Sequence, residues 1–197
     1  METIQKEEPS SQRIACSMRG IAEQIIKASK TIEKQPQKVK KMIEILMGAR
    51  RTAKVFILAD GRSGKMGEAF AIRLVHLGFT VYVMLKDTAV PRVTATDVVI
   101  VVSGTGTTNT VVAKLQSITK EKIKARIIVI TSHPKSPTGR RGNLVIELPG
   151  RDEASINEEE PPLSPLGSRF EINALGVLRG YNPGIDENYW NNREANG

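Results

Sequence analysis

The stretch VFILADGRSG at residues 55–64 decides the fold, because an apolar run without polar alternation passes directly into a turn of small and polar residues. A second stretch, VVIVVSGTGTT at residues 98–108, repeats this arrangement. Such a run is typical of a strand buried on both faces of a parallel sheet. Glycines let the backbone approach a ligand, hydroxyls add hydrogen bonds, and the free N–H groups of a following helix attract anions. Each stretch therefore predicts a phosphate-binding turn.

Strand and helix patterns alternate along the rest of the chain. Five strands are predicted, at residues 54–59, 80–85, 97–102, 126–131 and 143–148, with intervening helices at 64–77 and 108–118. Two amphipathic helices precede the first strand, and another is predicted at 168–178. This alternation indicates an α/β fold, a three-layer α/β/α sandwich around a five-stranded parallel sheet of the flavodoxin-like kind. Ligands bind beyond the carboxyl ends of such strands, where the two glycine-rich turns and the turn at 131–137 converge.

The domain organisation follows from length and composition. A chain of 197 residues with 40% hydrophobic residues is expected to form one domain, which we place at residues 11–180. Residues 1–10 are expected to form a flexible N-terminus, and 181–197 a C-terminal tail. The segment 149–165 is rich in proline and acidic residues and is either a functional loop or a linker.

Charge and cysteine usage limit the classes of partner. The net charge of +8 and pI near 9.7 would suit nucleic acid, but aromatic content is only 4% and no nucleic-acid-reading motif is present, so small anions are favoured over nucleic acid. No run approaches the ~20 apolar residues of a membrane span. A single cysteine, Cys16, indicates a reducing cytoplasm, and its apolar neighbours predict that the thiol is buried.

Three familiar kinds of site fit poorly. A P-loop is disfavoured because Ala59 stands at its first glycine and Met66 at its magnesium-binding hydroxyl. The second turn lacks the third glycine of a dinucleotide fingerprint, although a nicotinamide cofactor stays open as a minor alternative. His76, His133 and Cys16 have no metal-ligand spacing, so no metal site is expected.

Glu171 and His76 are the candidates for proton transfer. A sugar-phosphate isomerase needs a base between adjacent carbons and a group that assists at the oxygens, roles that carboxylate and imidazole both suit. A structural role is the alternative for each. Glu171 can be an exposed helix residue, and His76 can stabilise the carboxyl end of its helix as a cation.

Several segments resemble the sugar isomerase (SIS) domain family, and within it the 6-phospho-3-hexuloisomerases. These segments are GRSG (61–64), FAIRLVHLGF (70–79), VSGTGTT (102–108), ITSHPKSP (130–137) and PLGSRFE (165–171), in that order. The resemblance implies a cofactor-free isomerase that interconverts D-arabino-3-hexulose 6-phosphate and D-fructose 6-phosphate. It also implies a homotetramer, or at least a dimer. In the ribulose monophosphate pathway, that reaction stands next to an aldol step that fixes formaldehyde or releases it from pentose phosphate.

The resemblance also implies roles for individual residues. Hydroxyls and backbone of the two turns would hold the phosphate or the sugar hydroxyls, and Arg62 would lie at the pocket rim; the residues concerned are Gly61, Arg62, Ser63, Ser103, Gly104, Thr105, Thr107 and Thr108. Glu171 would carry a proton between two carbons through a cis-enediol, while His76, reaching a neighbouring subunit's pocket, would assist at the oxygens.

Two features of the sequence leave alternatives open. The family usually has Gly-Ala-Gly-Arg-Ser-Gly at the first turn, whereas Asp60 here places a carboxylate near the expected substrate, pointing either away from it or toward the phosphate. Some SIS domains belong to transcription factors, so a sugar-phosphate-binding regulator is the second hypothesis, together with an isomerase of another ketose or aldose phosphate. Against the regulator, the SIS match leaves no room for a helix-turn-helix domain.

Overall fold

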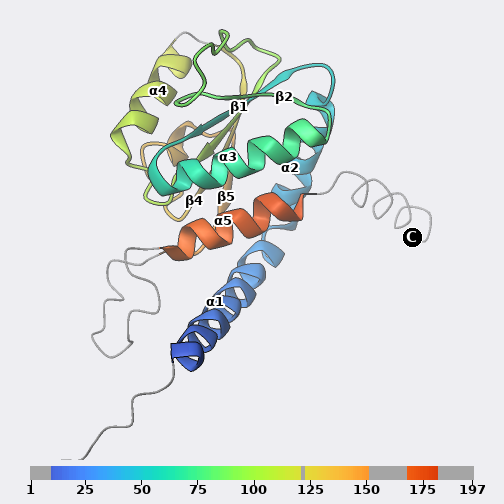
Figure 1. Cartoon of the computed structure of the whole chain (residues 1–197). Helices are drawn as coiled ribbons and strands as arrows, with labels where there is room; N and C mark the ends of the chain where they lie inside the picture. The colour runs from blue at the N-terminus through green and yellow to red at the C-terminus, as the bar shows by residue number, and fades with distance from the viewer. Residues whose placement is uncertain (1–9, 121–122, 151–167, 182–197) are drawn as a thin grey trace, which may run out of the picture.

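The computed structural model describes residues 10–120, 123–150 and 168–181, and contains one parallel sheet (Figure 1). Its strand order is β2-β1-β3-β4-β5. The strands are β1 (Lys54–Ala59), β2 (Thr80–Val83), β3 (Val98–Val102), β4 (Arg126–Thr131) and β5 (Leu144–Glu147). In register, Val55 lies opposite Val81 on one side and Val98 on the other. The predicted five-stranded parallel sheet is confirmed.

Helices cover both faces of the sheet (Figure 1). They are α1 (Ser10–Glu33), α2 (Pro36–Ala49), α3 (Gly61–His76), α4 (Asn109–Lys120) and α5 (Ser168–Gly180), with a short 3-10 helix η1 (Gly139–Arg141) before β5. One core joins the sheet to α2, α3 and α5 through residues such as Leu46, Leu74 and Phe170. The other core joins it to α4 through Val111 and Leu115. The three-layer α/β/α sandwich is therefore as expected.

The central pair of strands explains the apolar runs that predicted them. Every residue of β3 is buried, as are all residues of β1 after Lys54, because helices pack on both faces. The chain leaves β1 for α3 on one face and leaves β3 for α4 on the other. Strand order therefore reverses between β1 and β3, which is where ligands enter folds of this kind.

Among the element boundaries that differ from those predicted, two lie where a carboxylate caps the element. Helix α3 begins at Gly61 rather than residue 64, since the Asp60 side chain accepts a hydrogen bond from the Gly61 N–H at 2.8 Å. Strand β2 ends at Val83 rather than residue 85, since the Val83 N–H donates to the Asp87 carboxylate at 2.6 Å. Local side-chain capping of this kind is invisible to hydrophobic periodicity.

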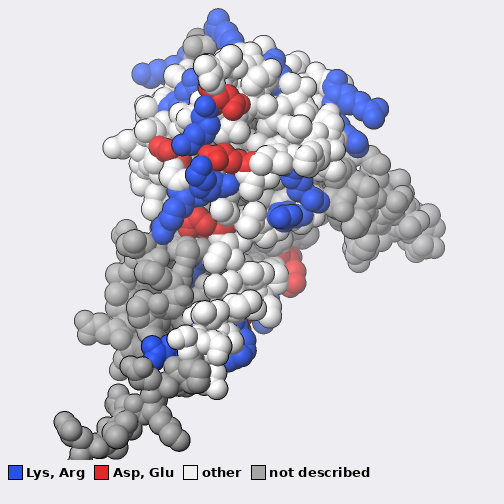
Figure 2. Space-filling model, viewed as in Figure 1, with Lys and Arg blue, Asp and Glu red and all other residues white. Residues whose placement is uncertain are grey.

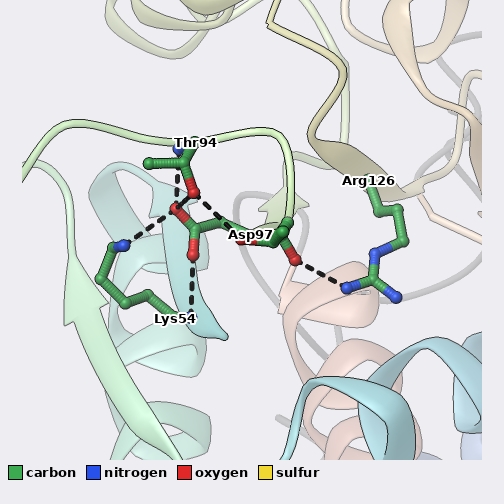
Figure 3. A network of polar contacts seen from close by, with 5 residues as sticks. Lys54, Thr94, Asp97 and Arg126 are labelled. Atoms are coloured by element: carbon green, nitrogen blue, oxygen red, sulfur yellow. Dashed lines mark hydrogen bonds and ion pairs between the residues drawn. The ribbon is translucent and has the colours of Figure 1, made fainter. Parts of the chain in front are cut away.

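A buried carboxylate organises the opposite, amino-terminal edge of the sheet (Figure 3). Asp97 is 1% exposed and accepts hydrogen bonds from the Lys54 N–H at 2.9 Å and from the Thr94 hydroxyl and N–H, each at 2.7 Å. The Lys54 ammonium lies 3.1 Å from the same carboxylate, and Arg126 donates to the neighbouring Thr96 carbonyl at 2.7 Å. The network joins the starts of β1, β3 and β4.

Helix α1 overturns the prediction of a buried thiol. Cys16 is exposed, and so are Ile14 and Met18, which are 63% and 65% exposed. Figure 1 shows the N-terminal part of α1 projecting from the body, so its apolar face has no described residues to pack against. Periodicity identified the helix correctly, but it cannot tell which part of an apolar face is covered within one chain.

Three predicted segments lie outside the described residues: most of the N-terminal segment 1–10, the greater part of 149–165, and the tail beyond Tyr181. Tyr181 itself is only 3% exposed and packs edge-on against Phe70 and Phe79, while its carbonyl accepts from Arg73. Among the described helices, none combines the length and apolar character that a membrane span requires.

Candidate active site

The first predicted turn is the amino end of α3 itself. Gly61 takes a positive φ of +58°, so the chain turns sharply from β1 into the helix. A Cβ on Gly67 would lie 2.8 Å from the Ile57 side chain, which shows how closely α3 is seated on β1. This seating places Ser63, half-buried, and Arg62, whose side chain is 54% exposed, at the carboxyl edge of the sheet.

The second turn follows β3 and carries the largest group of hydroxyls. Ser103 is 2% exposed, whereas Thr105, Thr107 and Thr108 are exposed. The Thr107 hydroxyl and N–H both donate to Thr105 Oγ1, at 3.0 and 3.3 Å, which gives the turn an ordered outer rim. The exposed hydroxyls and the amino end of α4 face the same edge, an arrangement suited to an anion.

The third predicted turn supports the second. The Gly104 carbonyl accepts hydrogen bonds from the Ser132 N–H at 3.0 Å and the Thr131 hydroxyl at 3.1 Å, and His133 Nδ1 lies 3.1 Å away. Gly106 has φ +67°, and a Cβ there would lie 1.9 Å from Ser136 Oγ. Only glycine fits this position, so the shape of the second turn is fixed by the third.

Helix α5 brings Glu171 to these turns. Phe170 is 3% exposed and packs over Gly104, where an added Cβ would lie 3.0 Å from its ring. The Glu171 side chain, next along the helix, is 13% exposed, and its Oε1 lies 3.7 Å from Arg62 Nε. The structure therefore brings Glu171, Arg62 and the second turn together, although they are far apart in the sequence.

Four buried side-chain atoms of the described residues have no hydrogen-bond partner: Ser103 Oγ, Ser132 Oγ, Glu171 Oε2 and Asn173 Oδ1. The first three belong to residues near Phe170. Ser103 precedes Gly104, on which Phe170 packs, and Glu171 follows Phe170. Ser132 lies near Gly150: a Cβ on Gly150 would lie 2.1 Å from Ser132 Oγ and 3.6 Å from Phe170 Cβ. Buried polar groups nearly always have partners, so a cluster of unpartnered ones marks a place for a polar ligand.

Ser132 was not among the predicted site residues. It lies in the turn at 131–137, which the sequence places at the ligand edge, but nothing in the sequence distinguishes it from its neighbours Thr131 and His133. The packing that distinguishes it comes from Gly150, which follows β5, and from Phe170 on α5. Such a combination exists only once the chain has folded.

His76 lies away from the other candidates within one chain. It is the last residue of α3, whereas Gly61 at the site is the first. Fifteen steps of 1.5 Å separate the two ends by about 22 Å. His76 is exposed beside Ile72 and Val75, which are 60% and 54% exposed. Any contribution of His76 to catalysis must therefore be made to the site of another subunit.

The Asp60 side chain contacts α4. Its carboxylate accepts from the Thr110 hydroxyl at 2.5 Å and from the Gly61 N–H at 2.8 Å. The Thr110 hydroxyl and the Gly61 N–H, with help from the Lys86 charge, hold the pKa of Asp60 below its ordinary value. The side chain is therefore an anion near neutral pH.

The site thus combines one partly buried carboxylate with a cationic neighbour and a hydroxyl-lined turn. A carboxylate so placed can exchange a proton with a carbon acid, and the turn can hold a phosphate. Within residues 10–120, 123–150 and 168–181, no group of three or more His, Cys, Asp or Glu side chains is arranged to hold a metal ion.

Comparison with known proteins gives a consistent result. The family model of the SIS domain matches residues 49–164. An uncharacterized protein of Aeropyrum pernix is 38% identical over 75% of this chain and 75% of its own. A 3-hexulose-6-phosphate isomerase of Methanocaldococcus jannaschii is 36% identical over 78% of this chain and 77% of its own.

A solved structure agrees with these sequence matches. A Methanococcus jannaschii protein, for which a molecular function of 3-hexulose-6-phosphate isomerase has been inferred, superposes with a TM-score of 0.64. It is 27% identical, and the match covers 81% of this chain and 82% of the other.

Proposed function

Because the chain belongs to the SIS domain family, we propose that it is a phosphosugar isomerase acting on D-arabino-3-hexulose 6-phosphate and D-fructose 6-phosphate. The observation that carries this proposal is the position of Glu171, whose Oε2 is buried without a partner next to Phe170, the residue that packs on the turn after β3. The relatives named 3-hexulose-6-phosphate isomerase support the choice of substrate. Such a reaction would stand next to an aldol step that joins formaldehyde to a pentulose phosphate. The single cysteine and the phosphorylated substrate favour the cytoplasm as its compartment.

The second turn would anchor the substrate phosphate. Its exposed threonine hydroxyls and the amino end of α4 offer hydrogen bonds and a favourable dipole to an anion. Gly61, Ser63 and Gly104 would contribute backbone or hydroxyl contacts at the same edge. Arg62 would remain at the rim, where its guanidinium, 3.7 Å from Glu171 Oε1, would orient the neighbouring carboxylate.

With the phosphate anchored, Glu171 would act as the base. It would remove the proton from C2, beside the C3 ketone of the hexulose, giving a cis-enediol, and return the proton to C3 to leave the ketone at C2. The hydroxyl proton moves from the oxygen on C2 to the oxygen on C3 at the same time. General base catalysis of this kind contributes about 10²- to 10⁴-fold in rate, and the Ser103 hydroxyl would stabilise charge on the enediol oxygens.

His76 would assist at those oxygens from a neighbouring subunit in a homotetramer, or at least a dimer. Support comes from the apolar residues Ile72 and Val75, which flank His76 on the exposed face of α3. A further apolar cleft of about 400 Å³ between α1, α2 and α5, lined by residues such as Ile25, offers a second contact surface. On the face drawn in Figure 2, charges of both signs are interspersed.

Substitution of Glu171 by Gln tests the proposal. The amide keeps the size of the side chain but cannot accept the proton, so isomerase activity should fall at least about 10²-fold. Binding of fructose 6-phosphate should change little. Activity is measured as fructose 6-phosphate formed from the hexulose phosphate in a coupled assay, with related ketose and aldose phosphates tested alongside.

Glu44→Gln is the matched control, because Glu44 is an exposed carboxylate of α2 paired with Lys41. It should leave activity unchanged. Turnover in Glu171→Gln at the rate of the unsubstituted chain contradicts the assignment of the base. Tight binding of fructose 6-phosphate without turnover of any sugar phosphate by the unsubstituted chain indicates the alternative, a sugar-phosphate-binding regulator.

A further inference from the structure

A side-chain bridge spans the place where strand order reverses. Asp60 follows β1 at the start of α3, and Thr110 lies in the first turn of α4, which follows β3. Although the two residues are 50 positions apart, the Thr110 hydroxyl donates to Asp60 Oδ2 at 2.5 Å. Because α3 and α4 cover opposite faces of the sheet, this hydrogen bond crosses the mouth of the crevice between β1 and β3.

The bridge occupies both oxygens of the Asp60 carboxylate. Oδ1 accepts from the Gly61 N–H at 2.8 Å, while Oδ2 accepts from Thr110. Asp60 therefore places a permanent negative charge at the amino end of α3, the position at which a free helix end would attract an anion. The second turn has no such acid, since residues 103–110 contain none, and its threonine hydroxyls remain exposed.

The two glycine-rich turns thus differ in charge, because only the turn after β1 contains an acidic residue, Asp60. The turn after β3 keeps its threonine hydroxyls exposed, whereas the turn after β1 carries the Asp60 carboxylate, which also reaches Thr110 in the first turn of α4. Arg62, also in the first turn of α3, faces Glu171, so one carboxylate of the site pairs with Arg62 and the other with Thr110. A substrate with one phosphate meets one receptive turn, and any second phosphate would meet a like charge.

We propose that the Asp60–Thr110 bridge selects sugars that carry a single phosphate. It does so by keeping a second anionic group off the amino end of α3 and by holding α4 and the second turn in position. This inference rests on the proposed function, since it concerns the specificity of the same site. Asp60 is a specificity residue in this scheme and takes no part in proton transfer.

The Asp60→Asn variant separates charge from geometry. Asparagine is an equally good helix cap and can keep both hydrogen bonds, while the negative charge is lost. Calorimetric titration should show that the unsubstituted chain binds fructose 6-phosphate about tenfold more tightly than fructose 1,6-bisphosphate. In Asp60→Asn, the affinity for the bisphosphate should rise about fivefold, with the monophosphate affinity within about twofold.

The Thr110→Val variant removes the bridge and keeps the charge. Because α4 loses its tether to α3, the KM for the monophosphate should rise about threefold to tenfold with a smaller change in kcat. Thr110→Ser retains the hydroxyl and should restore the original KM. Glu68→Gln, which removes a negative charge from the same helix at its pair with Lys65, should alter neither KM nor the ratio of the two affinities.

The outcomes distinguish this inference from the function on which it rests. Equal binding of monophosphate and bisphosphate by the unsubstituted chain, or an equal change of both affinities in Asp60→Asn, overturns the inference alone. Failure of the unsubstituted chain to bind either sugar overturns the proposed function and the inference with it. Thermal unfolding of each variant, expected within a few degrees of the unsubstituted chain, verifies that the variants are folded.

Discussion

Asp97 shows how much a single residue outside the candidate site contributes to the stability of the fold. Its carboxylate, 1% exposed, satisfies two backbone N–H groups, a hydroxyl and the Lys54 ammonium at the amino-terminal edge of the sheet (Figure 3). Asp97→Ala should lower the free energy of unfolding by about 3 kcal/mol, because it leaves these donors buried without an acceptor. Urea denaturation at neutral pH measures the change.

Asp87→Ala is the matched control for that substitution. Asp87 is also a carboxylate that accepts a backbone N–H, from Val83, but it is exposed. Its removal should lower the free energy of unfolding by about 1 kcal/mol or less. Equal losses in the two variants would contradict the importance given to the buried network.

The Asp97 carboxylate should also make the free energy of unfolding depend on pH. Burial raises the pKa of Asp97, but hydrogen bonds from Thr94 and Lys54 outweigh it and leave the pKa below its ordinary value of 3.8. A carboxyl whose pKa is lower in the folded state binds protons more readily when unfolded, so its stabilisation is present above the unfolded pKa and is lost as pH falls through the folded one.

The unfolding free energy should therefore decline below about pH 4, and Asp97→Asn should make that decline shallower. Urea denaturation repeated from pH 6 to pH 3 measures both slopes. Identical slopes in the variant and the unsubstituted chain would show that Asp97 is not a source of the acid sensitivity.

At the scale of single residues, the sequence predicted Glu171 and the turn hydroxyls as candidates, and the structure places them at one sheet edge, though their roles stay predictions. The sequence did not reveal the Asp97 network or the place of Ser132 in the site, since both depend on partners distant in the sequence. The Lys54 and Asp97 pair, for example, is separated by 43 positions. The expected burial of Cys16 was wrong for the same reason, because burial depends on what covers a helix.

At the scale of elements, the seating of α5 on the second turn decides where Glu171 lies. Phe170 packs on Gly104 and also lies near Gly150, so it links α5 to the ends of β3 and β5. Phe170→Ala should lower the unfolding free energy by about 3–5 kcal/mol and, by releasing the first turn of α5, reduce kcat. Unfolding and steady-state kinetics measure the two effects separately.

Leu178→Ala provides the comparison within the same helix. Leu178 is 2% exposed and lies two turns further along α5, remote from Glu171. Its truncation should cost about 2–5 kcal/mol in stability while leaving kcat nearly unchanged. A similar loss of kcat in both variants would mean that general loosening of α5, and not the contact with Gly104, controls the position of Glu171.

Elements were the most predictable level of the structure. All five strands and the helices around them follow from apolar runs and helical periodicity, because the core on each face of the sheet is continuous. The remaining errors are at element ends. The early start of α3 and the early end of β2 both arise from the capping carboxylates Asp60 and Asp87.

At the scale of the whole molecule, the exposed face of α3 should form a subunit contact. Ile72 is 60% exposed, next to His76, and replacement by Asp should disrupt the proposed assembly by placing a charge in an apolar interface. Size-exclusion chromatography with light scattering should show a smaller species. Activity should fall with it, since His76 would no longer reach a neighbouring site.

Ala113→Asp controls for the added charge, because Ala113 is exposed on α4, on the opposite face of the sheet. It should leave both mass and activity unchanged. An Ile72→Asp protein that keeps its mass would contradict the assignment of this face as a contact. If the mass falls while full activity remains, His76 does not act between subunits.

Hydrogen exchange at the substrate carbon tests the central claim most directly. Fructose 6-phosphate is incubated with the protein in D₂O, and the C3 proton is followed by NMR. If Glu171 removes and returns this proton, the unsubstituted chain should introduce deuterium at C3. The rate of exchange should be at least about 10²-fold lower with Glu171→Gln. Exchange at equal rates in the two proteins would contradict the account.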